Sequence, residues 1–261
     1  MSMIGTAARV PVERLSVEFL RAGGDLVLFP ERDDLSRILD ALRSGYLERS
    51  RLIDAVERVV RLKANLGLFD GAEYPLEEGD IEKTQEILSA IASKSVTKLR
   101  DLDGILPLKL KPGARVLAVS ITPREKNADS DDFPTLADEL EKRGFNVIRM
   151  TNPDHYRINE IIDRVDAVFI SSYIDTINCS GSSLRLGWNN LMTFWRGYVF
   201  KCKKTVFISF GDPYKLSELP FLRTYVNSYI KSEASVRATL AACLGEAEMT
   251  GRSPVKLPEN G

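Results

Sequence analysis

The 261-residue sequence holds few of the side chains from which metal sites and proton relays are most often built. It contains one histidine, His155, and three cysteines, Cys179, Cys202 and Cys243, which stand far apart with no C-x-x-C pair. An odd and scattered set of cysteines supports neither a disulfide framework nor a zinc site. Neither common type of glycine-rich phosphate-binding motif is present, so we expect no metal ion and no cofactor.

Excess charge and long apolar runs are also lacking. The 36 Lys and Arg residues balance 37 Asp and Glu residues to a net charge of -1, which gives no reason to expect a nucleic-acid partner. No apolar run approaches the about 20 residues that cross a bilayer, so no membrane partner is expected. The start of the chain lacks the basic stretch and apolar core of a signal peptide. The visible sequence therefore indicates a cytoplasmic protein, although a native N-terminus further upstream would leave the compartment open.

The first part of the chain carries helical patterns around one strand pattern. Apolar residues recur at helical spacing in three segments, which end near Gly24, Gly45 and Gly67. Asp25–Phe29, between the first two helices, is a short continuous apolar run, which is the pattern of a strand buried on both faces. The stretch 71–80 then has the glycine, proline and acidic residues of a linker.

Beyond this linker, short apolar strands alternate with amphipathic helices. Five strands are predicted, at 115–120, 145–150, 166–171, 205–210 and 224–230. Such alternation is typical of a mainly parallel sheet with helices on both faces. The predicted fold class is α/β, with a three-layer α/β sandwich over residues 81–261 preceded by a smaller α/β piece.

The loop after the fourth predicted strand contains the first candidate site residue, Asp212. In an open α/β sheet, ligands bind beyond the carboxyl ends of the strands, and Asp212 stands there within Phe210-Gly-Asp-Pro-Tyr214. A general acid or base is one interpretation. The favoured one is a turn that ends the strand, in which Asp212 bonds its own backbone.

A second loop, 178–183, precedes a predicted helix. Its hydroxyls and backbone amides could bind an anion at the helix N-terminus, although capping of the helix by Ser182 or Ser183 is favoured. His155 is the only base that a nucleophilic serine or Cys179 could use, and its place near a helix start favours a surface role. From these residues alone, no convincing catalytic constellation emerges.

Five short motifs stand in register across nearly the whole chain. They are Ala22–Leu28, Arg58–Asp70, Lys94–Leu108, Phe210–Tyr214 and Gly245–Pro258. Together they resemble the C-terminal portion of glycoside hydrolase family 3, and the bacterial β-N-acetylhexosaminidases are the branch they resemble most. Each motif alone is weak, whereas five in order are fairly specific.

The resemblance implies a division of the chain. Residues 1–70 would be a remnant of the end of a (β/α)8 barrel, 71–80 the linker, and 81–261 the C-terminal α/β sandwich domain. Because a full barrel takes about 250 residues, the strand Asp25–Phe29 would lack both neighbours and expose its edges and apolar side chains. We therefore expect a partner: the missing barrel, in the same parent chain or as a separate subunit, or a second copy. Carbohydrate would be reached only through that barrel.

The resemblance also implies where the catalytic groups of the family would lie. Ser2–Gly5 resembles the tail of the nucleophile motif, so the aspartate nucleophile would fall just before Met1, and the histidine–aspartate acid/base pair belongs to an earlier barrel loop. The β-glucosidase branch places its acid/base glutamate beside a segment whose counterpart, 179–186, has no glutamate here. We expect no catalytic residue in this chain. The residues that remain as a possible substrate rim are Asn178, Ser180, Gly181 and Arg185.

The leading hypothesis is the C-terminal part of a retaining glycoside hydrolase that acts on terminal β-linked N-acetylhexosamine and is not catalytic by itself. The alternative is a free-standing flavodoxin-like module that binds a ligand or another protein. A third and weaker hypothesis is an enzyme that uses Asp212 and His155.

Overall fold

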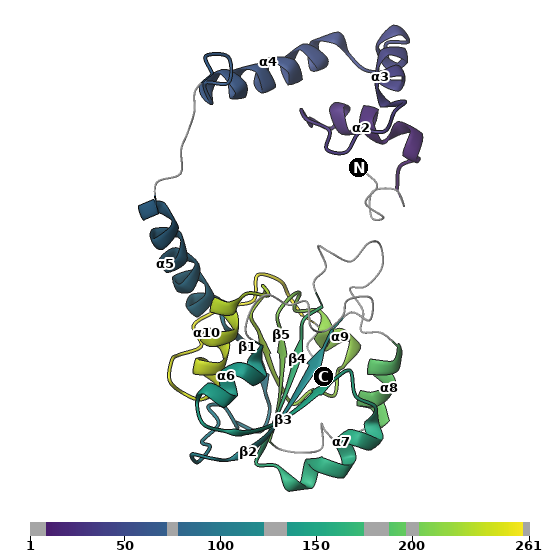
Figure 1. Ribbon diagram of the computed structural model, residues 1–261. Helices are drawn as coiled ribbons and strands as arrows, with labels where there is room; N and C mark the ends of the chain where they lie inside the picture. Colours follow the sequence, from purple (N-terminus) through teal and green to yellow (C-terminus); the bar gives the residue numbers. More distant parts are fainter. Residues whose placement is uncertain (1–8, 72–77, 123–134, 175–187, 197–203, 258–261) are drawn as a thin grey trace. The chain divides into compact units, whose positions relative to one another are not determined.

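The computed structural model describes residues 9–71, 78–122, 135–174, 188–196 and 204–257, without the side chains of 78–80 and 188–191. The chain divides into two compact units, Met1–Glu77 and Glu78–Gly261 (Figure 1). The first unit is helical in its described residues, and the second contains a sheet flanked by helices.

The first unit has a small core between short helices. A 3-10 helix, Val12–Arg14, precedes α2 (Leu15–Arg21), α3 (Asp34–Arg43) and α4 (Arg49–Asn65), which lie where the sequence predicts helices. Leu15 is buried, and five further buried apolar residues form one cluster: Val17, Leu20, Ala41, Leu47 and Ala55. Other large apolar side chains of the unit stay largely exposed, among them Ile53 and Val56 of α4.

The predicted strand Asp25–Phe29 is wrong: the segment belongs to no sheet. Leu26, Leu28 and Phe29 are 51%, 65% and 89% exposed. A strand that is apolar on both faces needs a strand on each side and a layer on each face, and the described part of the first unit supplies no strand. The apolar run therefore needs other residues to bury it, and the described part of the first unit does not supply them.

Arg51 of α4 fixes the start of this segment. Its guanidinium donates to the carbonyl oxygens of Leu20 (2.8 Å) and Gly24 (2.6 Å) and to the Asp25 carboxylate (2.7 Å). Arg58 of α4 lies 3.5 Å from the second carboxylate oxygen of Asp25. Charge-assisted bonds thus tie the end of α2 to α4, in addition to the apolar packing of Leu20 and Ala55 in the same cluster.

The second unit is built on one six-stranded sheet in the order β1-β6-β5-β4-β2-β3. Only β1 runs antiparallel to its neighbour, and the other pairs are parallel. The elements are α5 (Glu78–Ser95), β1 (Thr97–Asp101), β2 (Arg115–Ile121), α6 (Leu136–Lys142), β3 (Asn146–Thr151), α7 (His155–Ile161), a 3-10 helix (Ile162–Arg164), β4 (Ala167–Ser172), α8 (Trp188–Arg196), β5 (Thr205–Ser209), α9 (Lys215–Glu218), β6 (Thr224–Asn227) and α10 (Glu233–Cys243). The predicted three-layer α/β sandwich with a mainly parallel sheet is confirmed.

Two apolar clusters fill the space on either face of this sheet. Helices α6 and α10 cover one face, and α7, α8 and α9 cover the other (Figure 1). Along β4, Phe169 belongs to the first cluster, while Val168 and Ile170 belong to the second. Because both faces are covered, all side chains of β4 and β5 are buried, as expected for central parallel strands.

Strand β1 and the early end of β6 were not predicted. In β1 only Thr97 is buried, so the segment has no apolar run to reveal it, and its antiparallel partner β6 lies far along the chain. The fifth predicted strand extends to residue 230, whereas β6 ends at Asn227. Tyr229 has a φ of 61°, which is left-handed and incompatible with a continuing strand.

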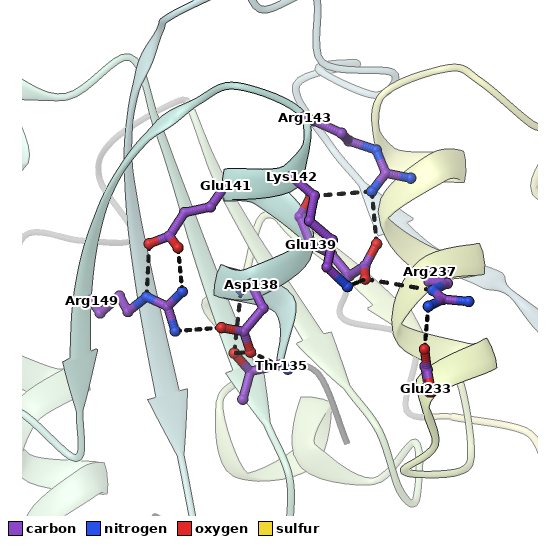
Figure 2. A network of polar contacts seen from close by, with 9 residues as sticks. All are labelled: Thr135, Asp138, Glu139, Glu141, Lys142, Arg143, Arg149, Glu233 and Arg237. Atoms are coloured by element: carbon purple, nitrogen blue, oxygen red, sulfur yellow. Dashed lines mark hydrogen bonds and ion pairs between the residues drawn. The ribbon is translucent and has the colours of Figure 1, made fainter. Parts of the chain in front are cut away.

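A network of ion pairs joins α6 to α10 and to β3 (Figure 2). Glu139 is nearly buried and accepts from Lys142 (2.7 Å) and Arg143 (3.1 Å), with Arg237 of α10 at 3.5 Å. Burial alone would raise the pKa of Glu139, but the hydrogen bonds and charges of these cations outweigh burial and lower the pKa. Arg149 of β3 joins the other side of α6. The network holds the helical layer together rather than forming a site.

Candidate functional site

The order of the strands places the candidate site at the carboxyl edge of the sheet. The chain passes from β2 to β3 on one side and then crosses back to β4 on the other side of β2. Ligands of open α/β sheets bind where the strand order reverses in this way. Asn178, Ser180, Gly181 and Arg185, the predicted rim residues, follow β4 but lie outside the described residues, so their role stays a prediction.

The ends of β2 and β3 are tied together by one amide side chain. Asn152 accepts from the backbone N–H of Thr122 (3.1 Å) and donates to its carbonyl oxygen (3.2 Å) and hydroxyl (3.1 Å). Asn152 has a φ of 43°, a left-handed conformation that asparagine tolerates better than most residues. This contact fixes the strand ends on one side of the reversal point.

Tyr173, directly after β4, occupies the middle of the edge. Its hydroxyl accepts from the backbone N–H of Leu136 at the start of α6 (2.9 Å), and its ring stacks on Phe210 with centroids 5.1 Å apart. The Lys231 ammonium lies 5.8 Å from the ring centroid. Tyr173 thus joins the exits of β4, β5 and β6 on one face of the sheet.

Asp212 forms a turn after β5 and is also paired with a buried lysine. One carboxylate oxygen accepts from the backbone N–H of Tyr214 (2.9 Å), as in the turn interpretation. The other accepts from Nζ of Lys215 (2.9 Å), whose side chain is 0% exposed; Glu218 lies 3.9 Å from the same ammonium. Sequence reasoning missed Lys215, although the i, i+3 spacing of Asp212 and Lys215 was a signal.

The same turn is packed against the neighbouring strands. A Cβ on Gly211 would lie 2.6 Å from the carbonyl oxygen of Ile174, so only glycine fits between the exits of β4 and β5. The Asn227 side chain donates to the Gly211 carbonyl oxygen (3.1 Å). Tyr225 lies beneath, and burial raises the pKa of its hydroxyl, which keeps the phenol neutral. The exits of β4, β5 and β6 are therefore packed closely together at this turn.

The groups at this edge do not assemble a catalytic pair among the described residues. Asp212 is committed to Tyr214 and Lys215, while His155 is half-exposed at the start of α7, where its ring lies 3.9 Å from that of Tyr156. Their strands, β5 and β3, are three strand steps apart, which is ~14 Å. Burial raises the pKa of the Cys243 thiol to about 12, so it is no nucleophile.

Metal and membrane features are equally scarce in the described ranges. No group of three or more His, Cys, Asp and Glu residues there is arranged to hold a metal ion. None of the described helices combines the length and the apolar character that crossing a membrane requires.

No family model matches the chain. A curated protein of Cellulomonas fimi, named β-N-acetylglucosaminidase/β-glucosidase, is 27% identical over 269 residues, which cover 97% of this chain and 48% of that protein. A solved structure of a β-glucoside phosphorylase, BglX, is 25% identical with a TM-score of 0.67 and covers 97% of this chain and 47% of its own.

A solved family 3 β-N-acetylglucosaminidase from Paenibacillus sp. str. FPU-7 supports the fold, with 22% identity, a TM-score of 0.67 and coverage of 97% of this chain and 48% of its own. The chain thus spans about half the length of the relatives it matches. Taken with the five motifs and the α/β sandwich, these matches show that the chain is related to the family 3 glycoside hydrolases and corresponds to a C-terminal portion of such an enzyme.

Proposed function

We propose that the chain is the C-terminal part of a retaining glycoside hydrolase that releases terminal β-linked N-acetylhexosamine, and that it is not catalytic by itself. Residues 1–70 would complete a (β/α)8 barrel, 71–80 would connect it, and 81–261 would pack as the sandwich domain. The substrate class comes from the names of two similar proteins, one from Cellulomonas fimi and one from Paenibacillus. The single observation that carries the proposal is the apolar segment Asp25–Phe29.

That segment supports a partner on physical grounds. Phe29 is 89% exposed, and Leu26 and Leu28 are more than half exposed. Helix α4 adds Ile53, Val56 and Val60, at i, i+3 and i+7 spacing, with exposures of 47%, 52% and 47%. An apolar segment that could pair as a strand, with an apolar stripe on a helix of the same unit, is what the strand and helix layers of a barrel wall require. The missing barrel is therefore the proposed cover.

The chemistry of the reaction also supports placing the catalytic groups in the barrel rather than in this chain. A retaining glycosidase needs a nucleophile and an acid/base about 5–5.5 Å apart in its usual carboxylate form. The nucleophile attacks the anomeric carbon while the acid/base protonates the leaving glycosidic oxygen, so that the C–O bond breaks and a glycosyl–enzyme forms. Water, deprotonated by the same acid/base, then hydrolyses the glycosyl–enzyme. Asp212, the carboxylate at the carboxyl edge with the best position, is held by Lys215 and by the Tyr214 backbone. The proposed catalytic groups belong to the barrel.

The test uses a chromogenic N-acetyl-β-glucosaminide. We expect no turnover by residues 1–261 alone, and turnover when these residues replace the matching half of the Cellulomonas fimi relative in a chimera. The N-terminal half of that relative alone is the control and should be inactive. Turnover by the chain alone that is lost in Asp212→Asn would contradict the non-catalytic role.

A second candidate reaction is phosphorolysis, which the β-glucoside phosphorylase match favours. In that case phosphate rather than water would attack the glycosyl–enzyme and release a sugar 1-phosphate. An assay of this chain together with its own barrel separates the two reactions, because a phosphorylase needs inorganic phosphate and forms the phosphate ester. A rate independent of phosphate, with free N-acetylhexosamine as product, supports hydrolysis.

A further inference from the structure

Helix α5 of the second unit carries large apolar side chains that are exposed to solvent. Ile81, Ile87, Leu88 and Ile91 are each between 50% and 56% exposed. Positions 81, 84, 88 and 91 follow one another at spacings of three, four and three, which puts them on one face of the helix, and Ile87 lies beside that face. These four apolar residues are called the α5 stripe below.

The α5 stripe lies on the part of the helix that the sandwich does not cover. Helix α10 packs beside the end of α5 (Figure 1), where Ala92 is only 3% exposed. Leu88 is on the same side of the helix one turn earlier and is 53% exposed. All residues of α5 from Ile81 to Ile91 are exposed. The apolar side of the helix thus continues past the sandwich, and a row of exposed apolar side chains of this kind indicates an interaction surface.

The α5 stripe is complementary to itself when two copies of the helix run in opposite directions. In the antiparallel register of a two-helix coiled coil, Ile81 of one copy faces Ile91 of the other, and Leu88 faces Thr84. The two copies of Ile87 then meet at the twofold axis. Each contact off the axis occurs twice, as an interface between identical subunits requires. The spacing of the stripe therefore fits a second copy of this chain.

The charges of α5 favour the same direction. Its first half, 78–86, contains four acidic residues and one lysine, whereas its last turn contains Lys94. Antiparallel copies place the acidic half of each helix near the basic end of the other and set the two helix dipoles against each other. Parallel copies would place the two acidic halves side by side, where like charges repel.

We propose that the α5 stripe binds the α5 stripe of a second copy of this chain as an antiparallel pair of helices. Four half-exposed side chains provide much less than the about 800 Å² per partner of a stable interface. The dimer is therefore weak, with a Kd on the order of 100 µM. This inference goes beyond the proposed function, because it uses none of the residues assigned to the substrate rim or to the contact with the barrel.

Sedimentation velocity of residues 1–261 at about 10–500 µM measures this association. All samples carry Phe29→Ser, so that the exposed apolar segment of the first unit does not contribute. We expect the weight-average sedimentation coefficient to rise with concentration. Leu88→Lys should raise the Kd by more than about tenfold, because it would bury an unpaired charge. Ala90→Lys is the matched control, since it adds the same charge on the opposite, exposed side of α5, and it should leave the Kd unchanged.

Oxidative cross-linking tests the direction of the helices. Cys179 and Cys202 are replaced by serine, and Cys243 is buried, so an introduced cysteine is the reactive thiol. With oxidised glutathione as the oxidant, Ile87→Cys should form a disulfide-linked dimer, because the two copies meet at this residue. Ile81→Cys should remain monomeric, because it faces Ile91. A parallel pair would instead be cross-linked at position 81.

The proposal is overturned if the Phe29→Ser protein stays monomeric over the whole concentration range, or if Leu88→Lys and Ala90→Lys associate equally. Cross-linking at position 81 rather than at position 87 would also contradict it. A monomeric chain in which Leu88→Lys abolishes the activity of the chimera would assign the stripe to the barrel instead of a second copy. The chimera without these changes tests the proposed function by itself, so the two proposals can fail separately.

Discussion

The two units of the chain differ in how completely each covers its own apolar residues. In the second unit every side chain of β4 and β5 is buried between two helical layers. In the first unit only a small cluster of five apolar residues is buried together, while Phe29 is 89% exposed. Both regions are rich in apolar residues, so composition does not distinguish them. An apolar run therefore predicts burial only when the strands and helices that would cover it are also present.

The most direct test of this difference is to measure the unfolding of the two units as separate fragments. We expect residues 78–261 to unfold in one cooperative transition in urea, and residues 1–77 to show a broad, weak one, because a cluster of five buried residues cannot offset the chain entropy. Near-UV and far-UV circular dichroism would follow both fragments. A cooperative transition of 1–77 alone would contradict this and would favour a free-standing module.

A single core change should have the next largest effect. Phe207 is 0% exposed and makes edge contacts with Tyr225 (centroids 5.5 Å apart) and Phe194 (6.3 Å). Phe207→Ala should cost about 3–5 kcal/mol in the free energy of unfolding. The matched change in the first unit is Leu20→Ala, at a residue that is 4% exposed. It should leave the main urea transition unchanged, and an equal loss from both variants would remove the contrast.

Removing the charge of Glu139 tests the polar contacts of the second unit (Figure 2). Glu139→Gln should cost about 1–2 kcal/mol at neutral pH, because three cations lose their shared anion, although Lys142 and Arg237 are more than half exposed. The folded-state pKa of Glu139 is lowered from 4.5. Its contribution is therefore complete above that pH and is lost as the pH falls through the folded-state value.

Urea unfolding of the wild type and Glu139→Gln at several pH values measures this difference. The gap between the two proteins should be constant above about pH 5.5 and should close in acid. Glu160→Gln, at an exposed carboxylate of α7, is the control and should show no gap. A gap that widens in acid would have the wrong sign.

The smallest expected effect on stability is at Phe29. Because its side chain is 89% exposed, Phe29→Ser should change the free energy of unfolding by less than about 0.5 kcal/mol. It should nevertheless reduce self-association, which sedimentation velocity would report as a lower weight-average sedimentation coefficient. Tyr156→Ser, at a 68% exposed residue of the second unit, is the control. Equal association of all three proteins would remove Phe29 from the proposed contact surface.

Local patterns were enough to predict most of the second unit. Strand β4 is predicted by its continuous apolar run and helix α10 by its helical periodicity, and both patterns involve only residues close in sequence. Thr135 caps α6 in a box with Asp138, a signal that is also local. Strand β1 was not predicted because the charged residues Lys98, which is exposed, and Arg100, which is half-buried, interrupt its apolar pattern and its partner is distant in sequence.

The candidate site was less accessible to sequence reasoning. The turn at Asp212 followed from the glycine and proline beside it, but the burial of Lys215 depends on how α9 packs over the end of the sheet. Nor does local sequence say that Gly211 lies against the carbonyl oxygen of Ile174, which follows another strand. Contacts between the loops that follow neighbouring strands depend on the tertiary structure, so local sequence does not predict them.

The position of Gly251 gives the second unit a property of its own. Its backbone N–H donates to the carbonyl oxygen of Val96 at 3.0 Å, so the segment that follows α10 returns beside the residue that precedes β1. A domain whose ends meet can be spliced into a surface loop of a host protein without stretching it. The part of the second unit between Val96 and Gly251 is therefore suited to insertion into a loop of another protein.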